Sequence, residues 1–367
     1  MNAELTVDAR WLRTGIGRYT HSLLSGLRDH LPDVQLSCIA QSKDARAVSG
    51  FVDRVVVCNA GIYGVREQLA LPRLARRTAA LYVPHYNIPI LWRGRLLTTI
   101  HDLNHLLDKS YCNTWRANAY ARPMLQRAVD QADVIVTPSR YTMLRLHENL
   151  RLDDSRVRVI PCCVAPCFVK REKAVSRKRV AQNPGVSRPF ILFVGGCSPN
   201  KNLQLLLTAV TTLRQRRDDF PLLVVAGKRG RCGAEARRLL NTLHLQRQVV
   251  WLDKLPDAIL ADLYSAALMT VMPSFEEGFG LPVIESMACG TPVLCSAAAS
   301  LPEVAGDAAL YFSPYSSEEL AAAIEALIDS SSMQERMIQA GLARAAVFSQ
   351  QEFSSRQASA IRAVLPN

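Results

Sequence analysis

The stretch PSFEEGFGLPVIESMACGTPV, residues 273–293, decides how this chain is interpreted, because it joins a glycine-rich loop to a short helix. Pro282 suits the first position of a helix, where its missing N–H would have no partner, and Gly290 suits the residue just past the helix end. We therefore expect Glu285 in the first turn and Glu277 on the loop before it. Backbone N–H groups at a helix start favour an anion, and two flanking carboxylates can accept hydrogen bonds from sugar or ribose hydroxyls. The pattern suits a sugar nucleotide, and its structural alternative is an ordinary capped turn.

Outward from this segment, short β-rich runs alternate with helical stretches along the whole chain. The helix expected from Ile16 has Tyr19, Leu23, Leu27 and Leu31 on one stripe. Uninterrupted apolar strands between amphipathic helices indicate parallel sheets covered on both faces, so the predicted fold class is α/β with two doubly wound domains. Strands are predicted near residues 4–8, 35–39, 54–58, 80–83, 97–100, 133–137, 157–160, 190–194, 222–226, 248–251, 268–272, 292–295 and 309–312.

The length and composition agree with two domains. The 367 residues are about twice the usual domain length, and 49% are hydrophobic. We find no apolar run long enough to cross a membrane and no signal-peptide pattern, so we expect a cytoplasmic protein. The ten cysteines form no regular framework, and the cluster Cys162, Cys163 and Cys167 lacks the CxxC spacing of a zinc site. We predict no metal and no cofactor.

The net charge of +12 lies in the first half of the chain. Residues 1–170 carry 23 Lys and Arg against 14 Asp and Glu, and residues 171–188 carry six against one, whereas residues 189–367 carry 15 against 17. A basic surface of this kind can meet an anionic membrane, a phosphorylated acceptor or nucleic acid. No nucleic-acid-binding motif is present, so we expect no nucleic-acid partner and infer an anionic membrane surface as a candidate.

The domain boundary is expected where the sequence becomes charged and is punctuated by Pro and Gly. Residues 171–188 fit this description and are predicted to be a linker between a domain at 1–170 and a second at 189–345. A final segment, residues 346–367, is rich in small and apolar residues.

A second glycine loop follows the strand predicted at 190–194. Gly195 and Gly196 lead through Pro199 and Lys201 into a helix expected near Asn202. Glycines let a phosphate approach the backbone, and Lys201 supplies a full positive charge beside the helix start. The chain has no Asp-x-Asp triplet to hold a divalent metal on a diphosphate. Lys201 and the helix starts can supply that positive field instead, which predicts metal-independent chemistry.

Two further places carry candidate residues. Thr14-Gly15-Ile16-Gly17 follows the first strand, but it lacks the third glycine of a dinucleotide fingerprint. His101 ends the strand LLTTI and is followed by Asp102. A buried structural histidine is the usual explanation for such a residue, and no third ligand accompanies His105 to make a metal site.

Taken together, these segments resemble retaining glycosyltransferases of family 4. The resemblance rests on PSFEEGFGLPVIESMACGTPV with five further blocks in family order, and it extends from residue 14 to 314. These blocks are TGIGRYTHSLLSGL (14–27), TTIHDL (98–103), VTPSRYT (136–142), FVGGCSPNKNLQLLLTAV (193–210) and SLPEVAGDAALYFSP (300–314). The resemblance implies the GT-B fold of two facing Rossmann-like domains. It places the acceptor side in residues 1–170, the nucleotide sugar in 189–345, and a helix of 346–367 back on the first domain.

The resemblance also implies residue roles. His101, Glu277 and Lys201 would be catalytic, with Lys201 holding the donor's diphosphate, and His85 and Asp102 would line the acceptor side. Asn200 and Cys197 stand where the family often has a further basic residue, so one phosphate contact is absent or comes from elsewhere. The implied donor-binding residues are Gly15, Gly17, Gly195, Gly196, Lys201, Glu277, Gly278, Phe279, Gly280, Leu281 and Glu285.

By the same resemblance, the chain transfers a hexose, mannose from GDP-mannose or glucose from a UDP donor, with retention of configuration. The acceptor would be a glycan or lipid-linked glycan in cell-surface polysaccharide synthesis, such as lipopolysaccharide, at the inner face of the membrane. The alternatives are a nucleotide-sugar epimerase or a phosphorylase of the same fold, and a catalytically silent glycan-binding protein.

Overall fold

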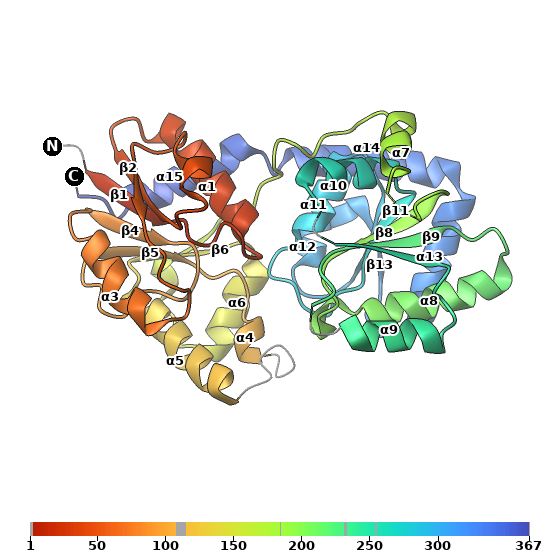
Figure 1. Cartoon of the computed structure of the whole chain (residues 1–367), viewed down its shortest axis with the longest axis horizontal. Helices are drawn as coiled ribbons and strands as arrows, with labels where there is room; N and C mark the ends of the chain where they lie inside the picture. The colour runs from red at the N-terminus through yellow and green to blue at the C-terminus, as the bar shows by residue number, and fades with distance from the viewer. Residues whose placement is uncertain (1–2, 108–114, 184, 231–232, 254, 367) are drawn as a thin grey trace. The chain divides into compact units, whose positions relative to one another are not determined.

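The computed structural model describes residues 3–107, 115–183, 185–230, 233–253 and 255–366, and it contains two units (Figure 1). Unit 1 combines Met1–Cys163 with Ser349–Asn367, and unit 2 is Val164–Phe348. Each unit has its own parallel sheet with helices against it. Each predicted strand is found, with ends within two residues of those expected, so the predicted α/β fold class is confirmed.

Unit 1 is built on a seven-stranded parallel sheet in the order β3-β2-β1-β4-β5-β6-β7. The strands are β1 (Glu4–Asp8), β2 (Gln35–Ala40), β3 (Arg54–Val57), β4 (Ala80–Val83), β5 (Arg95–Thr99), β6 (Val134–Thr137) and β7 (Val157–Val159). The helices are α1 (Gly17–His30), α2 (Ala45–Val48), α3 (Val65–Leu74), α4 (Asn104–Leu107), α5 (Trp115–Gln131), α6 (Arg140–Asn149) and α15 (Gln350–Arg362). The stripe predicted on the first helix is confirmed, because Tyr19, Leu23, Leu27 and Leu31 are all buried.

Unit 2 is built on a six-stranded parallel sheet in the order β10-β9-β8-β11-β12-β13. The strands are β8 (Phe190–Val194), β9 (Leu222–Ala226), β10 (Val249–Leu252), β11 (Met269–Met272), β12 (Val293–Ser296) and β13 (Ala309–Phe312). The helices are α7 (Lys173–Val180), α8 (Leu203–Arg216), α9 (Gly233–Thr242), α10 (Asp257–Ala266), α11 (Leu281–Ala288), α12 (Leu301–Ala305), α13 (Ser317–Asp329) and α14 (Ser331–Ala346).

The sheet of unit 2 is buried on both faces, which explains its uninterrupted apolar strands. Ile191 and Phe193 of β8 pack in a cluster with α8 and α13, whereas Phe190, Leu192 and Val194 pack in a second cluster with α10. Figure 1 shows α8 and α9 on one side of this sheet and α10 on the other. Alternate residues therefore serve opposite faces, as the period of a strand requires.

The segment expected as a linker is partly structured. Within residues 171–188, α7 packs against α10, and Ser176 Oγ donates to Asp262 Oδ1 at 3.0 Å. Arg171 also pairs with Asp262, at 2.8 Å. Asp262 is almost wholly buried, and its charge needs these partners from the basic segment. The composition of residues 171–188 did not predict this packed helix, because α7 buries few apolar side chains.

The last helix belongs to unit 1, although the chain reaches it from unit 2. α15 packs on α1, and Gln357 is fully buried there. Its Nε2 donates to Tyr19 Oη at 2.8 Å, while its Oε1 accepts from Tyr82 Oη at 2.9 Å. Both ends of the amide are thus satisfied inside unit 1, which fixes α15 against the sheet.

Candidate functional site

The candidate site of unit 2 lies at the carboxyl edge of its sheet, between β8 and β11. These strands are neighbours, but the chain continues from β8 to β9 on one side and from β11 to β12 on the other. Ligands of open parallel sheets bind in the crevice at such a reversal. The loop after β8 and the loop after β11 meet here, because the Phe275 N–H donates to Asn200 O at 2.8 Å.

Lys201 and Glu277, predicted separately from the two glycine loops, are in direct contact. Lys201 Nζ lies 2.6 Å from Oε1 and 2.8 Å from Oε2 of Glu277. The lysine side chain is 23% exposed and the carboxylate side chain 10% exposed. Partial burial weakens solvent screening, so both charges act strongly on anything bound beside them. The site thus offers a cation and an anion side by side.

Neutral side chains that the sequence reasoning missed hold this pair in place. Ser274 Oγ donates to Glu277 Oε1 at 2.7 Å, and Ser300 Oγ donates to the carbonyls of Glu277 and Phe279 at 2.9 and 3.0 Å. Asn202 Nδ2 donates to Pro273 O at 3.0 Å. The loop after β11 is therefore anchored from the residues that cap α12 and α8, which preorganises the carboxylate.

Two glycines have conformational reasons for their positions. Gly280 precedes α11 with φ +98°, and a Cβ there would lie 2.7 Å from Leu301 Cδ2. Gly195 has φ +153°, and its N–H donates to Ala226 O at 3.0 Å. Gly195 therefore provides room beside Lys201, but its N–H extends the sheet and is not an open donor for a phosphate.

Three other residues predicted to bind the sugar nucleotide lie on the loop after β11 and at the start of α11. Phe279 is buried and packs edge-on against Phe348 at 5.6 Å, so its ring serves the core. Gly278 lies between Glu277 and Phe279, and Leu281 begins α11.

Glu285 was expected in the first turn of its helix, but α11 begins at Leu281, so Glu285 is its fifth residue. It is 1% exposed, and its Oε2 accepts from Tyr264 Oη of α10 at 2.9 Å. The helix starts one residue earlier than expected because Gly280, not Leu281, takes the cap position. Gly290 does stand just past the helix end, with φ +73°.

The remaining predicted residues belong to unit 1. A Cβ at Gly17 would lie 2.0 Å from Leu12 O, so only glycine fits there, whereas Gly15 has open space around its Cα. Asp102 Oδ1 accepts from the Asn104 N–H at 2.9 Å and supports the start of α4. His85 is buried, stacked on Trp11 with ring centroids 4.0 Å apart.

His101 lies just after β5 with a defined tautomer. Its Nε2 lies 3.0 Å from Pro84 O, so Nε2 carries the proton and donates it to this carbonyl. The ring meets Tyr19 edge-on at 4.6 Å. Burial lowers the pKa of His101 to about 4, partly opposed by the hydrogen bond to Pro84. The imidazole is consequently neutral at pH 7.

We expect His101 to make the protein less stable in acid. Between pH 6.5 and about 4 the unfolded chain binds a proton that the folded protein does not, so this contribution is present above pH 6.5 and is lost as the pH falls. Urea unfolding at pH 7 and pH 4.5 measures the difference. His101→Gln should reduce the acid-induced loss by roughly 2 kcal/mol, whereas the exposed control His21→Gln should not. Equal losses in wild type and His101→Gln would contradict this assignment.

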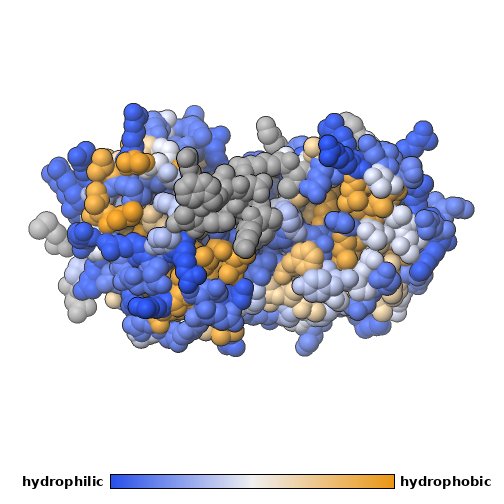
Figure 2. Space-filling model, turned by 90° about the horizontal axis from the view of Figure 1, so that it is seen from below, coloured by the Kyte–Doolittle hydropathy of each residue, from blue (hydrophilic) through white to orange (hydrophobic). Residues whose placement is uncertain are grey.

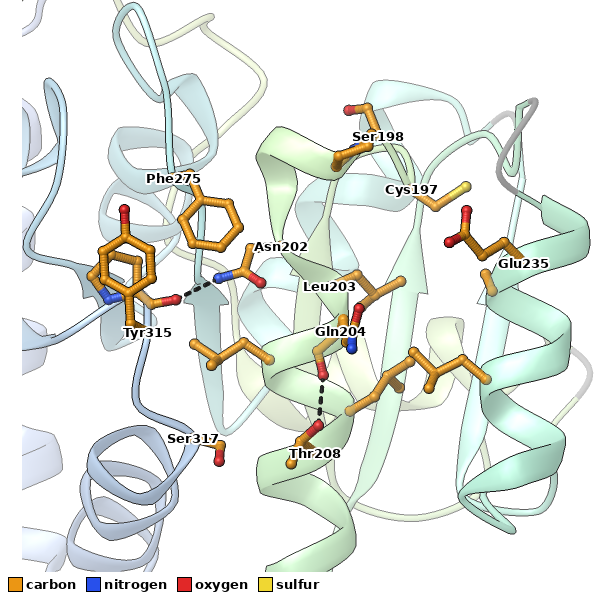
Figure 3. Close-up of a pocket in the computed structure, with 16 residues that line it drawn as sticks. Cys197, Ser198, Asn202, Leu203, Gln204, Thr208, Glu235, Phe275, Tyr315 and Ser317 are labelled. Atoms are coloured by element: carbon orange, nitrogen blue, oxygen red, sulfur yellow. Dashed lines mark hydrogen bonds between the residues drawn. The ribbon is translucent and has the colours of Figure 1, made fainter. Parts of the chain in front are cut away.

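A separate pocket of about 470 Å³ lies beside the loop after β8 (Figure 3). It shares Cys197, Ser198 and Pro199 with that loop, and the rings of Phe275 and Tyr315 stand 5.3 Å apart at its side. Neither Lys201 nor Glu277 is among its lining residues. The paired charges therefore lie outside this pocket. No group of three metal-ligating side chains is found within the described residues.

Models of two known families together match most of the chain. The model "Glycosyltransferase Family 4" matches residues 13–166, and the model "Glycosyl transferases group 1" matches residues 175–344. The match boundaries lie close to those of the two units.

Curated relatives and solved structures agree with these matches. The O-antigen chain mannosyltransferase B of Escherichia coli is 30% identical over 73% of this chain and 68% of its own length. The D-inositol 3-phosphate glycosyltransferase of Corynebacterium glutamicum (strain R) is 28% identical over 71% of this chain and 64% of its own length. Sucrose-phosphate synthase from Thermosynechococcus elongatus is similar in fold, with a TM-score of 0.79 at 20% identity over 99% of both chains. Anabaena HepE, solved in complex with UDP-glucose, has a TM-score of 0.79 at 17% identity over 98% of this chain and 99% of its own. The fold is therefore that of GT-B glycosyltransferases.

Proposed function

This chain belongs to the glycosyltransferases of group 1 and family 4, and from that membership we propose that it moves a hexose from a nucleotide-diphosphate sugar to a glycan or lipid-linked glycan. The observation that carries the proposal is the Lys201–Glu277 pair at the strand reversal of unit 2. The name of the Escherichia coli relative favours mannose, and the UDP-glucose bound to HepE favours glucose. We propose GDP-mannose as the favoured donor, with transfer of mannose, and UDP-glucose as the alternative donor, with transfer of glucose.

The paired charges match the charges that this reaction develops. The bond between the anomeric carbon and the diphosphate oxygen breaks, positive charge grows on the sugar ring, and negative charge grows on the leaving diphosphate. In this proposal Lys201 stabilises the diphosphate, and Glu277 accepts hydrogen bonds from the sugar and opposes its positive charge; their contact with each other supports a shared site. The acceptor oxygen then bonds to the anomeric carbon, and its proton passes to the departing phosphate oxygen. We propose that the configuration is retained.

The other predicted residues take supporting roles in this proposal. Glu285 would bind the ribose, with Tyr264 orienting its carboxylate. His101, neutral and with a fixed tautomer, would contact the donor sugar, and the loop of Gly15 and Gly17 would contact the diphosphate. The open space at Gly15 leaves room for that contact.

A donor panel tests the proposal. GDP-mannose, UDP-glucose and ADP-glucose are each incubated with the protein, and release of the nucleoside diphosphate is measured with and without a glycan acceptor. We expect slow hydrolysis of one donor and faster release with acceptor present. An epimerised nucleotide sugar would instead support an epimerase, and sugar 1-phosphate formed in a parallel incubation of glycan with inorganic phosphate would support a phosphorylase. No reaction with any donor or with phosphate would support a silent glycan-binding protein.

We expect turnover to need no divalent metal, because Lys201 already supplies a positive charge and the sequence contains no Asp-x-Asp triplet. Donor release is measured with excess EDTA and again after magnesium or manganese is added. Rates should agree within experimental error. Complete loss in EDTA, restored by either metal, would show that the diphosphate is held in another way.

We also propose that unit 1 binds reversibly to an anionic membrane at the inner face of the cell membrane. Val65 and Leu69 of α3 are 82% and 47% exposed, and Ile90 and Leu91 are 39% and 50% exposed. Gln68 joins the two groups, since its Oε1 accepts from the Ile90 N–H at 2.7 Å. The basic residues exposed on or near α3 are Arg66, Arg73, Arg76, Arg77 and Arg93.

The helix that carries part of this face contains a proline. α3 runs from Val65 to Leu74 through Pro72, which removes one helical N–H donor. Leu71 of the same helix is buried in the core and does not belong to the exposed apolar residues. On the left of Figure 2, apolar groups of unit 1 lie among hydrophilic ones. Within the described residues, no helix is long and apolar enough to cross a bilayer.

Vesicle sedimentation measures this association. We expect binding to vesicles with anionic lipid at low salt and release at high salt, because each basic side chain near such a surface contributes on the order of 1 kcal/mol. Replacing Arg66 and Arg73 by Glu should abolish binding, whereas the same changes at the exposed Arg237 and Arg238 of α9 should not. Equal, negligible binding to anionic and neutral vesicles would remove the membrane role and favour a soluble glycan acceptor.

A further inference from the structure

Aromatic side chains gather at the carboxyl edge of the unit 1 sheet. Tyr63 lies edge-on to Trp11, His85 and Tyr120, with centroid distances of 5.9, 6.0 and 6.2 Å. Trp11 and His85 are stacked and buried behind it, while Tyr63 is 48% exposed and Tyr120 is 37% exposed. This edge includes the end of β1 and the start of the loop after β4, where the strand order of unit 1 reverses.

A buried polar network fixes Tyr120 from below. Tyr120 Oη donates to Asn87 Oδ1 at 2.6 Å, and Asn87 Nδ2 donates to Glu67 Oε1 at 2.8 Å. Glu67 in turn accepts from Arg10 Nη2 at 2.9 Å. The Asn87 N–H donates to His85 Nδ1 at 3.0 Å, so the same residue orients the histidine. The exposed ring of Tyr120 and the buried ring of His85 are therefore both positioned by hydrogen bonds to Asn87.

Tyr63 is held in a conformation that large side chains rarely adopt. Its φ is +64°, in the left-handed region that disfavours a residue with a Cβ. Such strain persists where surrounding contacts determine the backbone, and it gathers at ligand sites. Trp11 adds a second observation, because its buried indole N–H has no hydrogen-bond partner among the described residues.

The charges in this region favour a neutral ligand. Arg10 is fully buried, and two carboxylates, Asp8 and Glu67, pair with its guanidinium at 2.8 and 2.9 Å. Arg10, Asp8 and Glu67 together carry a net negative charge, because two carboxylates face one guanidinium. Burial also lowers the pKa of His85 well below its usual range, so the imidazole beside Trp11 adds no positive charge. A phosphate here would meet a carboxylate excess, whereas a sugar ring offers C–H faces to the aromatic rings and hydroxyls to the polar tips.

We propose that Tyr63 and Tyr120 form the stacking surface for an uncharged sugar ring of the acceptor, with the Trp11–His85 stack behind them. This inference rests on the proposed glycosyl transfer and names the acceptor class of that reaction: a neutral saccharide end rather than a phosphorylated one.

Saturation-transfer NMR and ligand titration with methyl α-D-mannopyranoside, methyl α-D-glucopyranoside and mannose 6-phosphate test it. The full chain should transfer saturation from aromatic protons to the ring protons of a neutral glycoside and bind mannose 6-phosphate more weakly. Tyr63→Ala and Tyr120→Ala should each raise the glycoside Kd about tenfold, on the scale of an aromatic contact. Tyr63→Phe keeps the ring and should bind nearly as wild type. The control Tyr315→Ala removes an exposed aromatic ring of unit 2 and should change nothing.

The outcomes separate this inference from the proposed function. Equal glycoside binding by wild type and both alanine variants, tighter binding of mannose 6-phosphate, or no glycoside binding at all would overturn the stacking surface. Thermal unfolding shows whether each variant is folded, and Tyr63→Phe keeps the test valid if Tyr63→Ala is not. Failure of every nucleotide-sugar donor to react in the separate release assay would instead overturn the transferase proposal.

Discussion

Replacing Lys201 by alanine is expected to lower the rate of hexose transfer by about 10²-fold or more, the scale of losing one preorganised electrostatic partner. Lys201 Nζ lies 2.6 Å from Glu277, at the point where the strand order of unit 2 reverses. Its charge stabilises the leaving diphosphate in our mechanism, so the loss should fall mainly on kcat and remain with saturating donor. Glu277→Ala should have an effect of the same size, because it removes the carboxylate that opposes the growing positive charge.

Matched controls make this prediction specific. Lys178→Ala and Glu335→Ala remove exposed charges of the same kind from α7 and α14, and both should keep near-normal rates. Because Lys201 and Glu277 are in contact, the double variant should lose less than the product of the two single effects. If folded Lys201→Ala and Glu277→Ala proteins turn over at wild-type rates, the site assignment is wrong.

Replacing Arg10 by methionine is expected to lower the free energy of unfolding of unit 1 by about 3 to 5 kcal/mol. The guanidinium is fully buried and bonds to Asp8 and Glu67, so its removal leaves two buried carboxylates without a cation. Urea unfolding followed by tryptophan fluorescence measures the change, since Trp11 is the next residue in the chain. The loss of unfolding free energy should be smaller when Arg10→Met is combined with Asp8→Asn and Glu67→Gln, because these changes remove the unpaired charges.

Arg28→Met is the control for this change. Its side chain is 44% exposed, and the side chain of its carboxylate partner, Asp53, is 36% exposed. Exposed ion pairs contribute about 0 to 1 kcal/mol, so the change should be small. Equal effects of Arg10→Met and Arg28→Met would mean that the buried network contributes no more than a surface pair.

Local patterns were enough to predict the sheets and to select Lys201 and Glu277 as candidates, but not the ion pair between them. Each strand is a short apolar run, and the loops that carry Lys201 and Glu277 both follow such runs, so the rule that ligands gather at strand ends places them at one edge. The contact between these two residues, 76 positions apart, confirms that placement. The role of Gly195 was not predictable, because its hydrogen bond to Ala226 depends on pairing with β9.

Features that depend on tertiary contacts were missed for a physical reason. Ser274 and Ser300 are unremarkable in sequence, and their importance arises only from folding Glu277 between them. Arg10, two residues past β1, resembles a surface arginine until Glu67 is brought to it from α3. The positive φ of Tyr63 has no signal in its neighbours Ile62 and Gly64. The charged composition of residues 171–188 likewise did not predict α7, because its packing on α10 depends on the contacts of Ser176 and Arg171 with the buried Asp262.

Isothermal titration of nucleoside diphosphates tests the central claim, that the strand reversal of unit 2 holds the diphosphate of a nucleotide sugar. GDP, UDP and ADP are titrated into wild type, Lys201→Ala and the control Lys178→Ala. We predict that one nucleotide binds wild type and Lys178→Ala alike, and that Lys201→Ala weakens it at least about tenfold, since a charge-assisted contact contributes on the order of 1.4 kcal/mol or more. Binding of that nucleotide with the same Kd to Lys201→Ala, or binding of none of the three nucleotides to the wild-type protein, would contradict it.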